Sequence, residues 1–467
     1  MTLNIKNMAK PNKMATMPVH SLLLDMAGPM MISMLGQALY NVVDSYFVSH
    51  MPDTAVITAV GDKAVNALTL AFPIQMLMIA ACVGTGVGIN AGLARSFGKG
   101  DREKASYTAG NAIFVSCCYY IACLLFGLWG TKAFILTQTN NPIIGNMAVD
   151  YLRIVTIWSM GTILYMCLEK IIMATGNTVI TMTAQLAGAI TNIILDPIMI
   201  YGLYGCPILG IKGAAIATVM GQFVSLIIIL HFYFTRTLPF DKAWHCLEPR
   251  ADILKNIYVV GAPAILMQIL APCMTYGMNL ILGSISTSAV TAYGIYYKLQ
   301  NFIFMPAYGL NNASIPVISY NYGAKEIRRV RDSIKYALIM VTVIMVAGFV
   351  ILQLLTMRIL GLFSLAAASI SLCVLAVRIT TWSFLFAGFN IILQGVCQAL
   401  GNGFYSLVIS LLRMIVIVLP LAWIFSLLPQ ASTVVWFSLA LAEAIACVVA
   451  IYFTRRLFKM VKGDYVK

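Results

Sequence analysis

The chain has 467 residues, of which 61% are hydrophobic and only 10% carry a charge, and its mean hydropathy is +0.89. Soluble domains carry about a quarter of their residues as Asp, Glu, Lys or Arg, so this composition excludes a soluble globular protein. The net charge of +14 could indicate nucleic-acid binding, but the cations cluster between apolar segments, which favours membrane topology and no nucleic-acid partner.

Apolar segments long enough to cross a bilayer recur along the whole chain. A hydrocarbon core about 30 Å thick needs roughly 20 apolar residues per helix. By this measure the sequence predicts an all-α integral membrane protein with twelve transmembrane helices. The expected spans are 21–50, 62–95, 104–129, 143–174, 178–203, 209–235, 252–282, 286–320, 327–357, 368–400, 403–428 and 431–458.

The basic residues lie mostly on one side of the expected spans. If the N-terminus is inside, the inner clusters fall at 6–13, 95–104, 236–255, 325–335 and 455–467. The expected outer loops carry only Lys63, Lys132, Lys212 and Arg358. The positive-inside rule then predicts that the protein is multi-pass with both termini in the cytoplasm.

The sequence contains a repeat at a shift of 225 positions. Ala64-Val65 matches Ala289-Val290, Gly98 matches Gly323, Arg153 matches Arg378, and Gly176-Asn177 matches Gly401-Asn402. Six spans per repeat insert both halves the same way up, with a cleft expected between them. We therefore expect an N-terminal lobe over 1–235, a cytoplasmic linker over 236–251, and a C-terminal lobe over 252–467.

The stretch TNIILDP at 191–197 places polar groups inside an apolar span. Asn192 and Asp196 are four residues apart, so their side chains point to one face of a helix. Pro197 follows at once and removes a backbone N–H, so we expect the helix to bend and a carbonyl to lose its partner. This combination suggests a site for a small cation or a proton.

The first span carries the other acid of this half. Asp44 follows Tyr40 and Asn41 at helical spacing, and Pro29, fifteen residues earlier, is expected to kink the span. Counted along the helices, Thr218 in the sixth span reaches a depth similar to those of Asp44 and Asp196. We expect Asp44, Asn192, Asp196 and Thr218 to converge, with Tyr40 beside them.

Two carboxylates close together in a low dielectric cannot both remain charged cheaply, so the pair could hold a proton at neutral pH. With an amide and a hydroxyl nearby, the oxygens could instead bind Na⁺. A purely structural role remains open, in which Asp196 caps a broken helix and Asp44 bonds a neighbouring span. The residues do not choose between H⁺ and Na⁺.

The C-terminal half lacks these acids, because Met278 occupies the position equivalent to Asp44. Glu443 is expected to pair with one of the mid-depth arginines. Other intramembrane polar residues are candidates for the cleft or for contacts with substrate, because charged groups inside a membrane are rare and often functional. They are Asn41, Glu169, Gln268, Lys298 and Glu443.

The sequence argues against an enzyme or a cofactor site. The eleven cysteines include no CxxC pair, and the four histidines are scattered. An intramembrane prenyltransferase would want a DxxxD pair for a magnesium-diphosphate group, and none is present. A flippase for a lipid-linked saccharide is the alternative within transporters, although such a protein usually needs clustered cations in its cleft.

The chain resembles the MATE (multidrug and toxic compound extrusion) transporters over nearly its whole length. The features that carry the resemblance are GPMM and LYNVVDSYFV in the first span, the loop 95–104, NIILDP at 192–197, GAAIAT at 213–218 and IPVISYNYGAK at 315–325. It looks most similar to the bacterial branch with acids in the N-terminal lobe. Some members carry an acid early in span seven, where Gln268 and its neighbours supply none.

The resemblance implies two six-helix lobes arranged in a V, in the inner membrane of a bacterium. It implies efflux of organic cations and other amphipathic drugs in exchange for inward H⁺ or Na⁺, with no cofactor. On the matching positions Asp44, Asn192, Asp196 and Thr218 would form the cation site and Pro29 the bending point. We expect a monomer embedded in lipid.

Overall fold

The computed structural model describes residues 13–53, 58–361 and 367–466, with side chains for all of these except 367–369 and 461–466. Helices make up nearly all of this described part, which contains no strand. The α-helices are α1 Lys13–Thr16, α2 Val19–Ser49, α3 Val60–Lys99, α4 Arg102–Leu125, α5 Thr131–Leu136, α6 Pro142–Ile157, α7 Met160–Ala174, α8 Thr178–Tyr201, α9 Ile211–Thr235, α10 Ala251–Ile285, α11 Thr287–Gly323, α12 Ile327–Leu360, α13 Ala367–Thr380, α14 Phe384–Ala399, α15 Gly403–Leu411, α16 Val418–Ser426, α17 Ala431–Val434 and α18 Phe437–Val466.

The expected all-α membrane fold is confirmed. Ten helical segments in the described chain are long and apolar enough to cross a membrane, and α6 with α7 forms an eleventh span bent by 45°. The remaining expected span corresponds to α11, which has 37 residues and is therefore about 55 Å long, but has no continuous stretch as apolar as those of the other spans. Together these segments account for the twelve spans.

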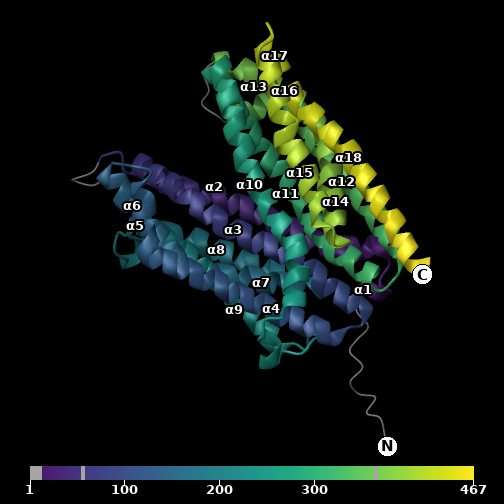
Figure 1. The fold of residues 1–467 in the computed structure, drawn as a ribbon. Helices are drawn as coiled ribbons and strands as arrows, with labels where there is room; N and C mark the ends of the chain where they lie inside the picture. Colours follow the sequence, from purple (N-terminus) through teal and green to yellow (C-terminus); the bar gives the residue numbers. More distant parts are fainter. Residues whose placement is uncertain (1–12, 54–57, 362–366, 467) are drawn as a thin grey trace, which may run out of the picture.

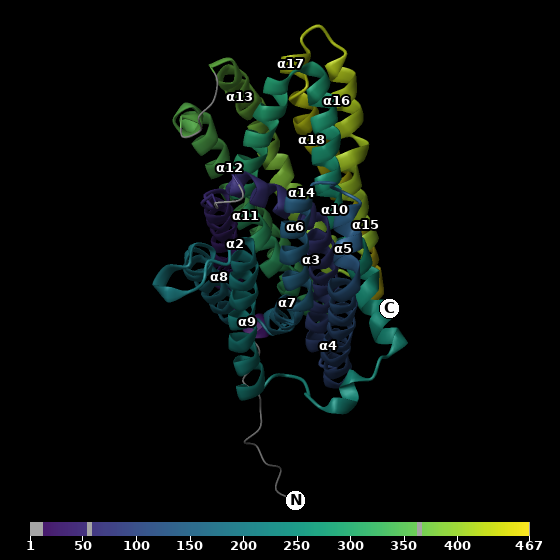
Figure 2. The same ribbon diagram turned by 90° about the vertical axis from the view of Figure 1, so that its left-hand side faces the viewer.

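The helices form two groups, α2–α9 (the N-lobe) and α10–α18 (the C-lobe). Figure 1 shows the two groups diverging from the end where α1 and the last turns of α18 lie, and Figure 2 shows the same arrangement from the side. The first long helix of each group crosses to the other group. Helix α2 packs on α11 as well as on α8, and α10 packs on α3 as well as on α15. The lobes are thus joined through exchanged helices.

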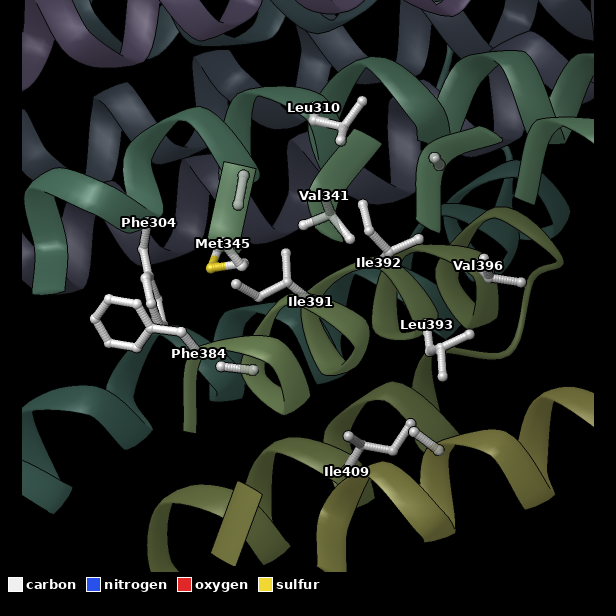
Figure 3. Close-up of a cluster of buried hydrophobic side chains, with 14 of the residues drawn as sticks. Phe304, Leu310, Val341, Met345, Phe384, Ile391, Ile392, Leu393, Val396 and Ile409 are labelled. Carbon is white, nitrogen blue, oxygen red and sulfur yellow. The ribbon is translucent and has the colours of Figure 1, made fainter. Parts of the chain in front are cut away.

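One apolar core joins the C-lobe helices to part of α2, and two further cores lie mainly in the N-lobe. Figure 3 shows the centre of the C-lobe core, where side chains of α11, α12, α14 and α15 interdigitate. The outward faces are apolar as well, with Leu354 and Phe234 more than two-thirds exposed. An exposed apolar surface of this extent on long helices is what lipid contact requires.

Several spans deviate from a straight α-helix. Helix α4 continues through a π-helical turn at Phe126–Gly130 into α5, and α15 continues through a second π-helical turn at Leu412–Val416 into α16. By contrast, α2 and α8 run unbroken through Pro29 and Pro197. Bending at these two prolines therefore stays a prediction.

The lobes approach each other closely where α3 crosses α11. A Cβ built on Gly98 would lie 2.0 Å from the carbonyl oxygen of Tyr320, and one built on Gly323 would lie 2.2 Å from that of Arg95. The two glycines are equivalent positions of the sequence repeat, so the repeat places a pair of side-chain-free positions at one crossing. Only glycine permits backbones to come this close.

The same end is held by polar contacts between the lobes. Arg95 of α3 donates through Nη2 to the carbonyl oxygen of Ala399 in the C-lobe at 3.2 Å, and this oxygen also accepts from Ser319 within the C-lobe at 2.9 Å. The guanidinium of Arg95 also lies 5.5 Å from the ring centroid of Tyr322. A second repeat pair, Gly176 and Gly401, has positive φ angles of 92° and 85°, so both halves use glycine to end the preceding helix.

The segment 236–251 crosses from α9 to α10 and lies against α4. Asn111 of α4 donates through Nδ2 to the carbonyl oxygen of Glu248 at 2.9 Å and accepts from the backbone N–H of Arg250 at 2.9 Å. Arg102 pairs with Asp241 at 2.8 Å. The connection between the lobes is therefore fastened to the N-lobe. Of the basic segments used to predict topology, residues 6–12 and 467 lie outside the described residues.

Candidate ion and substrate site

A cavity of about 510 Å³ lies between the two lobes. Its N-lobe wall comes from α2, α3, α7, α8 and α9, and its C-lobe wall from α10, α11, α14, α15 and the π-helical turn that follows α15. The volume lies within the range of small-molecule sites. The cavity is therefore large enough for an amphipathic ligand and has both lobes as walls.

The predicted acid cluster is brought together at the N-lobe side. The carboxyl groups of Asp44 on α2 and Asp196 on α8 lie within hydrogen-bonding reach of each other. Asn192, one turn before Asp196, donates through Nδ2 to Asp196 Oδ1 at 3.3 Å and to Thr218 Oγ1 at 3.3 Å. The helical spacing and the depth along α9 thus predicted this convergence correctly.

Three oxygens of the cluster have no hydrogen-bond donor in the described chain. They are Asp44 Oδ1, Asn192 Oδ1 and Asp196 Oδ2, and all three are buried. A buried oxygen without a donor costs free energy, and a charged one costs more. A bound proton or cation would supply the missing positive charge, because carboxylate, amide and hydroxyl oxygens are also the ligands that hard cations prefer.

The acids lie behind the cavity wall rather than in it. Tyr40, Asn192 and Thr218 line the cavity, whereas the side chains of Asp44 and Asp196 do not. Asp196 is completely buried and Asp44 is half-buried. A ligand in the cavity would therefore touch Thr218 and Asn192, and Asn192 also donates to Asp196 behind the wall.

The structure adds two residues to the cluster, Tyr151 and Gln75, which the sequence gave no reason to choose. Tyr151 on α6 lies within hydrogen-bonding reach of Thr218, as Tyr40 does, and it accepts from Gln75 of α3 at 3.3 Å. Tyr151 follows a polar residue in an otherwise ordinary apolar run, so no spacing signal marks it. The cluster thus draws on four helices besides α2 and carries two phenol groups.

The other candidates divide into those that face the cavity and those that do not. Asn41, Glu169 and Gln268 line it, and Glu169 pairs at 3.5 Å with its neighbour Lys170, which also lines it. Lys298 does not line this cavity, and its placement in the cleft stays a prediction. Its side chain is exposed because it points away from the packed face of α11 that carries Tyr293 and Tyr296.

Glu443 pairs with an arginine, as expected, and the partner is Arg413. The nitrogens Nε and Nη2 of Arg413 donate to Glu443 Oε1 at 2.9 and 2.6 Å. Asn390 donates to Glu443 Oε2 at 2.7 Å. Glu443 itself lies outside the cavity wall, whereas Arg413 is part of it.

Among the described residues no group of three or more His, Cys, Asp and Glu side chains is arranged to hold a metal ion. The acid cluster has only two carboxylates, so it suits a monovalent ion rather than a divalent metal. A helical membrane protein with two lobes, a cavity between them and a buried acid pair beside that cavity has the architecture of an alternating-access transporter.

The comparisons with known proteins identify the family. The MatE family model matches the chain twice, over residues 29–198 and 263–424, which is more than half of its length. The chain belongs to the MatE family. The two matched segments cover corresponding parts of the two halves related by the sequence repeat.

Relatives match over nearly the full length. The multidrug export protein MepA of Staphylococcus saprophyticus is 26% identical over 443 residues, covering 94% of this chain and 95% of the relative. MepA of Staphylococcus haemolyticus is 28% identical, covering 91% and 90%. A solved structure, described as an outward-facing multidrug resistance MATE family transporter of the MOP superfamily, aligns with a TM-score of 0.90 at 23% identity over 97% of this chain and 99% of that one.

Proposed function

We propose that this protein is a multidrug efflux antiporter that exports organic cations and other amphipathic drugs in exchange for inward H⁺ or Na⁺. Membership of the MatE family and full-length similarity to proteins named for multidrug export support the drug substrates. In this role the protein is a transporter rather than an enzyme, and the ion is cargo rather than a cofactor.

The observation that carries the proposal is the set of buried oxygens without donors beside a cavity between the lobes. Asp44 and Asp196 lie within hydrogen-bonding reach of each other, and no arginine or lysine pairs with either one among the described residues. In a low dielectric two such carboxylates repel each other strongly unless a cation or a proton is shared between them. A mobile positive charge is therefore the natural partner of the pair.

The geometry suggests how ion and drug compete. Asn192 and Thr218 both face the cavity, and Asn192 links Thr218 to Asp196 of the acid pair. When the pair takes an ion, its oxygens turn toward that ion, and α2 is expected to bend at Pro29 and narrow the cavity. Drug then leaves outward, and the lobes rock so that the inner crossing at Gly98 and Gly323 opens.

Several finer points belong to the same proposal. The N-terminal lobe comprises residues 1–235, the C-terminal lobe comprises residues 252–467, and residues 236–251 form a cytoplasmic linker between them. Both termini face the cytoplasm. The protein acts as a monomer in the inner membrane of a bacterium. Support comes from the basic clusters near Arg102 and Arg329 and from the way the linker is fastened to α4.

Transport by purified protein tests the proposal. Reconstituted vesicles with an imposed pH gradient or an imposed Na⁺ gradient are loaded with ethidium, and its efflux is followed by fluorescence. One of the two gradients should drive efflux in the wild type, which also identifies the ion. Efflux that ignores both gradients, or that depends on added ATP, would refute antiport.

A further inference from the structure

Arg413 gives the C-lobe wall of the cavity a cation that faces the ligand space. It lies in the π-helical turn Leu412–Val416, which inserts an extra residue between α15 and α16 and so re-aims the side chains that follow. The side chain of Arg413 is only 4% exposed, yet the residue lines the cavity. A buried guanidinium at a cavity wall is costly unless it has partners.

The orientation of the ion pair leaves one face of the guanidinium available. Nε and Nη2 are both directed to Glu443 Oε1, whose carboxylate lies behind the wall. The third nitrogen, Nη1, has no partner in the described chain. Since an arginine fork can form two parallel bonds with a second acceptor group, the free nitrogen offers a donor to a ligand.

Two neutral side chains on the same wall are also without partners. Gln394 on α14 is 7% exposed, lines the cavity, and has no acceptor for Nε2. Asn311 on α11 lines it as well, with no donor for Oδ1. The side chain of Asn311 occupies the space beside Gly395, where an added Cβ would lie 1.9 Å from Oδ1. These groups are held in place by packing and their hydrogen-bonding capacity is unused.

The opposite wall, which belongs to the N-lobe, has acidic groups in it and behind it. Glu169 lines the N-lobe wall together with Lys170, so that pair presents both signs of charge to the cavity. Behind Asn192 lie Asp44 and Asp196 with their unpartnered oxygens. The cavity therefore has unused donors at Arg413 and Gln394 on the C-lobe side and acids on the N-lobe side.

We propose that the C-lobe wall around Arg413 and Gln394 is a subsite for the anionic or strongly accepting group of the substrate. The preferred substrates are then zwitterionic amphipaths, with a carboxylate at Arg413 and an ammonium or delocalised cation toward the N-lobe acids. This inference rests on the proposed export function and names its substrate class. A pair that serves only to stabilise the fold would not discriminate between an acid and its ester.

A matched pair of dyes separates the two readings. Rhodamine 110 carries a delocalised cation and a free carboxylate, and rhodamine 123 is its methyl ester, with the same ring system and no carboxylate. Binding of each dye to purified protein in detergent is measured by fluorescence polarisation. The wild type should bind the acid about tenfold more tightly than the ester, as expected for a charge-assisted hydrogen bond.

The test variant neutralises both members of the pair, R413Q with E443Q, so that no lone charge is left in the C-lobe. The expected result is loss of the roughly tenfold preference for the acid, with binding of the ester within about twofold of the wild type. Arg413→Lys keeps the charge and should retain part of the preference. Arg378→Gln is the matched control, because Arg378 is a C-lobe cation that is exposed and does not line the cavity.

Equal affinity of the wild type for acid and ester would overturn the proposal, and so would an equal loss of both dyes in the double variant. Gln394→Leu provides a second arm that leaves the ion pair intact, and it should weaken the acid more than the ester. Because binding is measured without a gradient, these outcomes are distinct from a failure of antiport, which would appear as efflux that ignores imposed pH and Na⁺ gradients.

Discussion

Each lobe buries acid inside the membrane, but the two lobes balance it in different ways. In the C-lobe both oxygens of Glu443 accept hydrogen bonds, one from Arg413 and the other from Asn390. In the N-lobe Asp44 and Asp196 have only each other and one amide, and an oxygen of each lacks a donor. A fixed arginine neutralises an acid permanently, whereas an acid pair without a fixed cation needs a mobile one. We therefore propose that the coupling ion binds at the N-lobe acid pair, which has no arginine partner among the described residues.

The largest effect should come from neutralising the N-lobe acids. Asp44→Asn and Asp196→Asn remove the charge that attracts the mobile cation, so drug efflux from reconstituted vesicles should fall to that of vesicles without protein. Asp150→Asn is the control, since Asp150 is half-buried and pairs with Lys212 at 3.2 Å outside the cluster. If efflux persisted at the wild-type rate in both variants at equal protein content, the contrast between the lobes would have no functional meaning.

The C-lobe pair should respond in stability instead of coupling. Glu443→Gln leaves Arg413 charged and buried, which costs about 3–5 kcal/mol, whereas changing both residues to glutamine should restore much of the loss. Thermal unfolding in detergent measures the effect. The exposed pair of Arg102 and Asp241 is the comparison, and Asp241→Asn should cost less than about 1 kcal/mol. A Glu443→Gln variant as stable as the wild type would contradict the view that this acid serves as a permanent counter-charge.

A smaller effect is expected at the crossing of α3 and α11, which both lobes share. Gly98→Ala would place a methyl group 2.0 Å from the carbonyl oxygen of Tyr320, so the helices must separate at a cost of about 1–3 kcal/mol. Gly294→Ala on α11 is the control, because nothing lies within 4 Å of its Cβ. Thermal unfolding compares the two, and equal stabilities would show that the close approach is unimportant.

The smallest effect should be at Thr218. Thr218→Val removes the hydroxyl that accepts from Asn192 at 3.3 Å, which should weaken ion binding by about five- to tenfold. Thr218→Ser keeps the hydroxyl and should stay near the wild type. The ion concentration that gives half-maximal gradient-driven efflux is the measurement. A larger loss in Thr218→Ser than in Thr218→Val would assign the effect to packing and not to the oxygen.

Much of the N-lobe site could be predicted because its signals are local. Asn192 and Asp196 are one turn apart, and Asp44 and Thr218 each stand out as polar residues at a computable depth in an apolar span. The repeat was equally visible, since both copies end a helix with glycine and cross at glycine. Periodicity and composition determine these features without knowledge of how the helices pack.

The rest depends on rotation of helices about their axes, which the sequence does not specify. Tyr151 reaches Thr218 from α6 only because α6 packs on α9. Arg413 aims at the cavity because of a π-helical turn that no residue type announces. Lys298 is exposed and does not line the cavity, and depth alone could not say which face of α11 it occupies.

The most direct test asks whether drug binding displaces an ion from the acid pair. Purified protein in weakly buffered solution is titrated with ethidium while released protons are followed with a pH dye and released Na⁺ with an ion-selective electrode. The account predicts release of H⁺ or Na⁺ from the wild type and none from the Asp44→Asn and Asp196→Asn variants. Release that continues unchanged in both variants would contradict the claim that these two carboxylates hold the coupling ion.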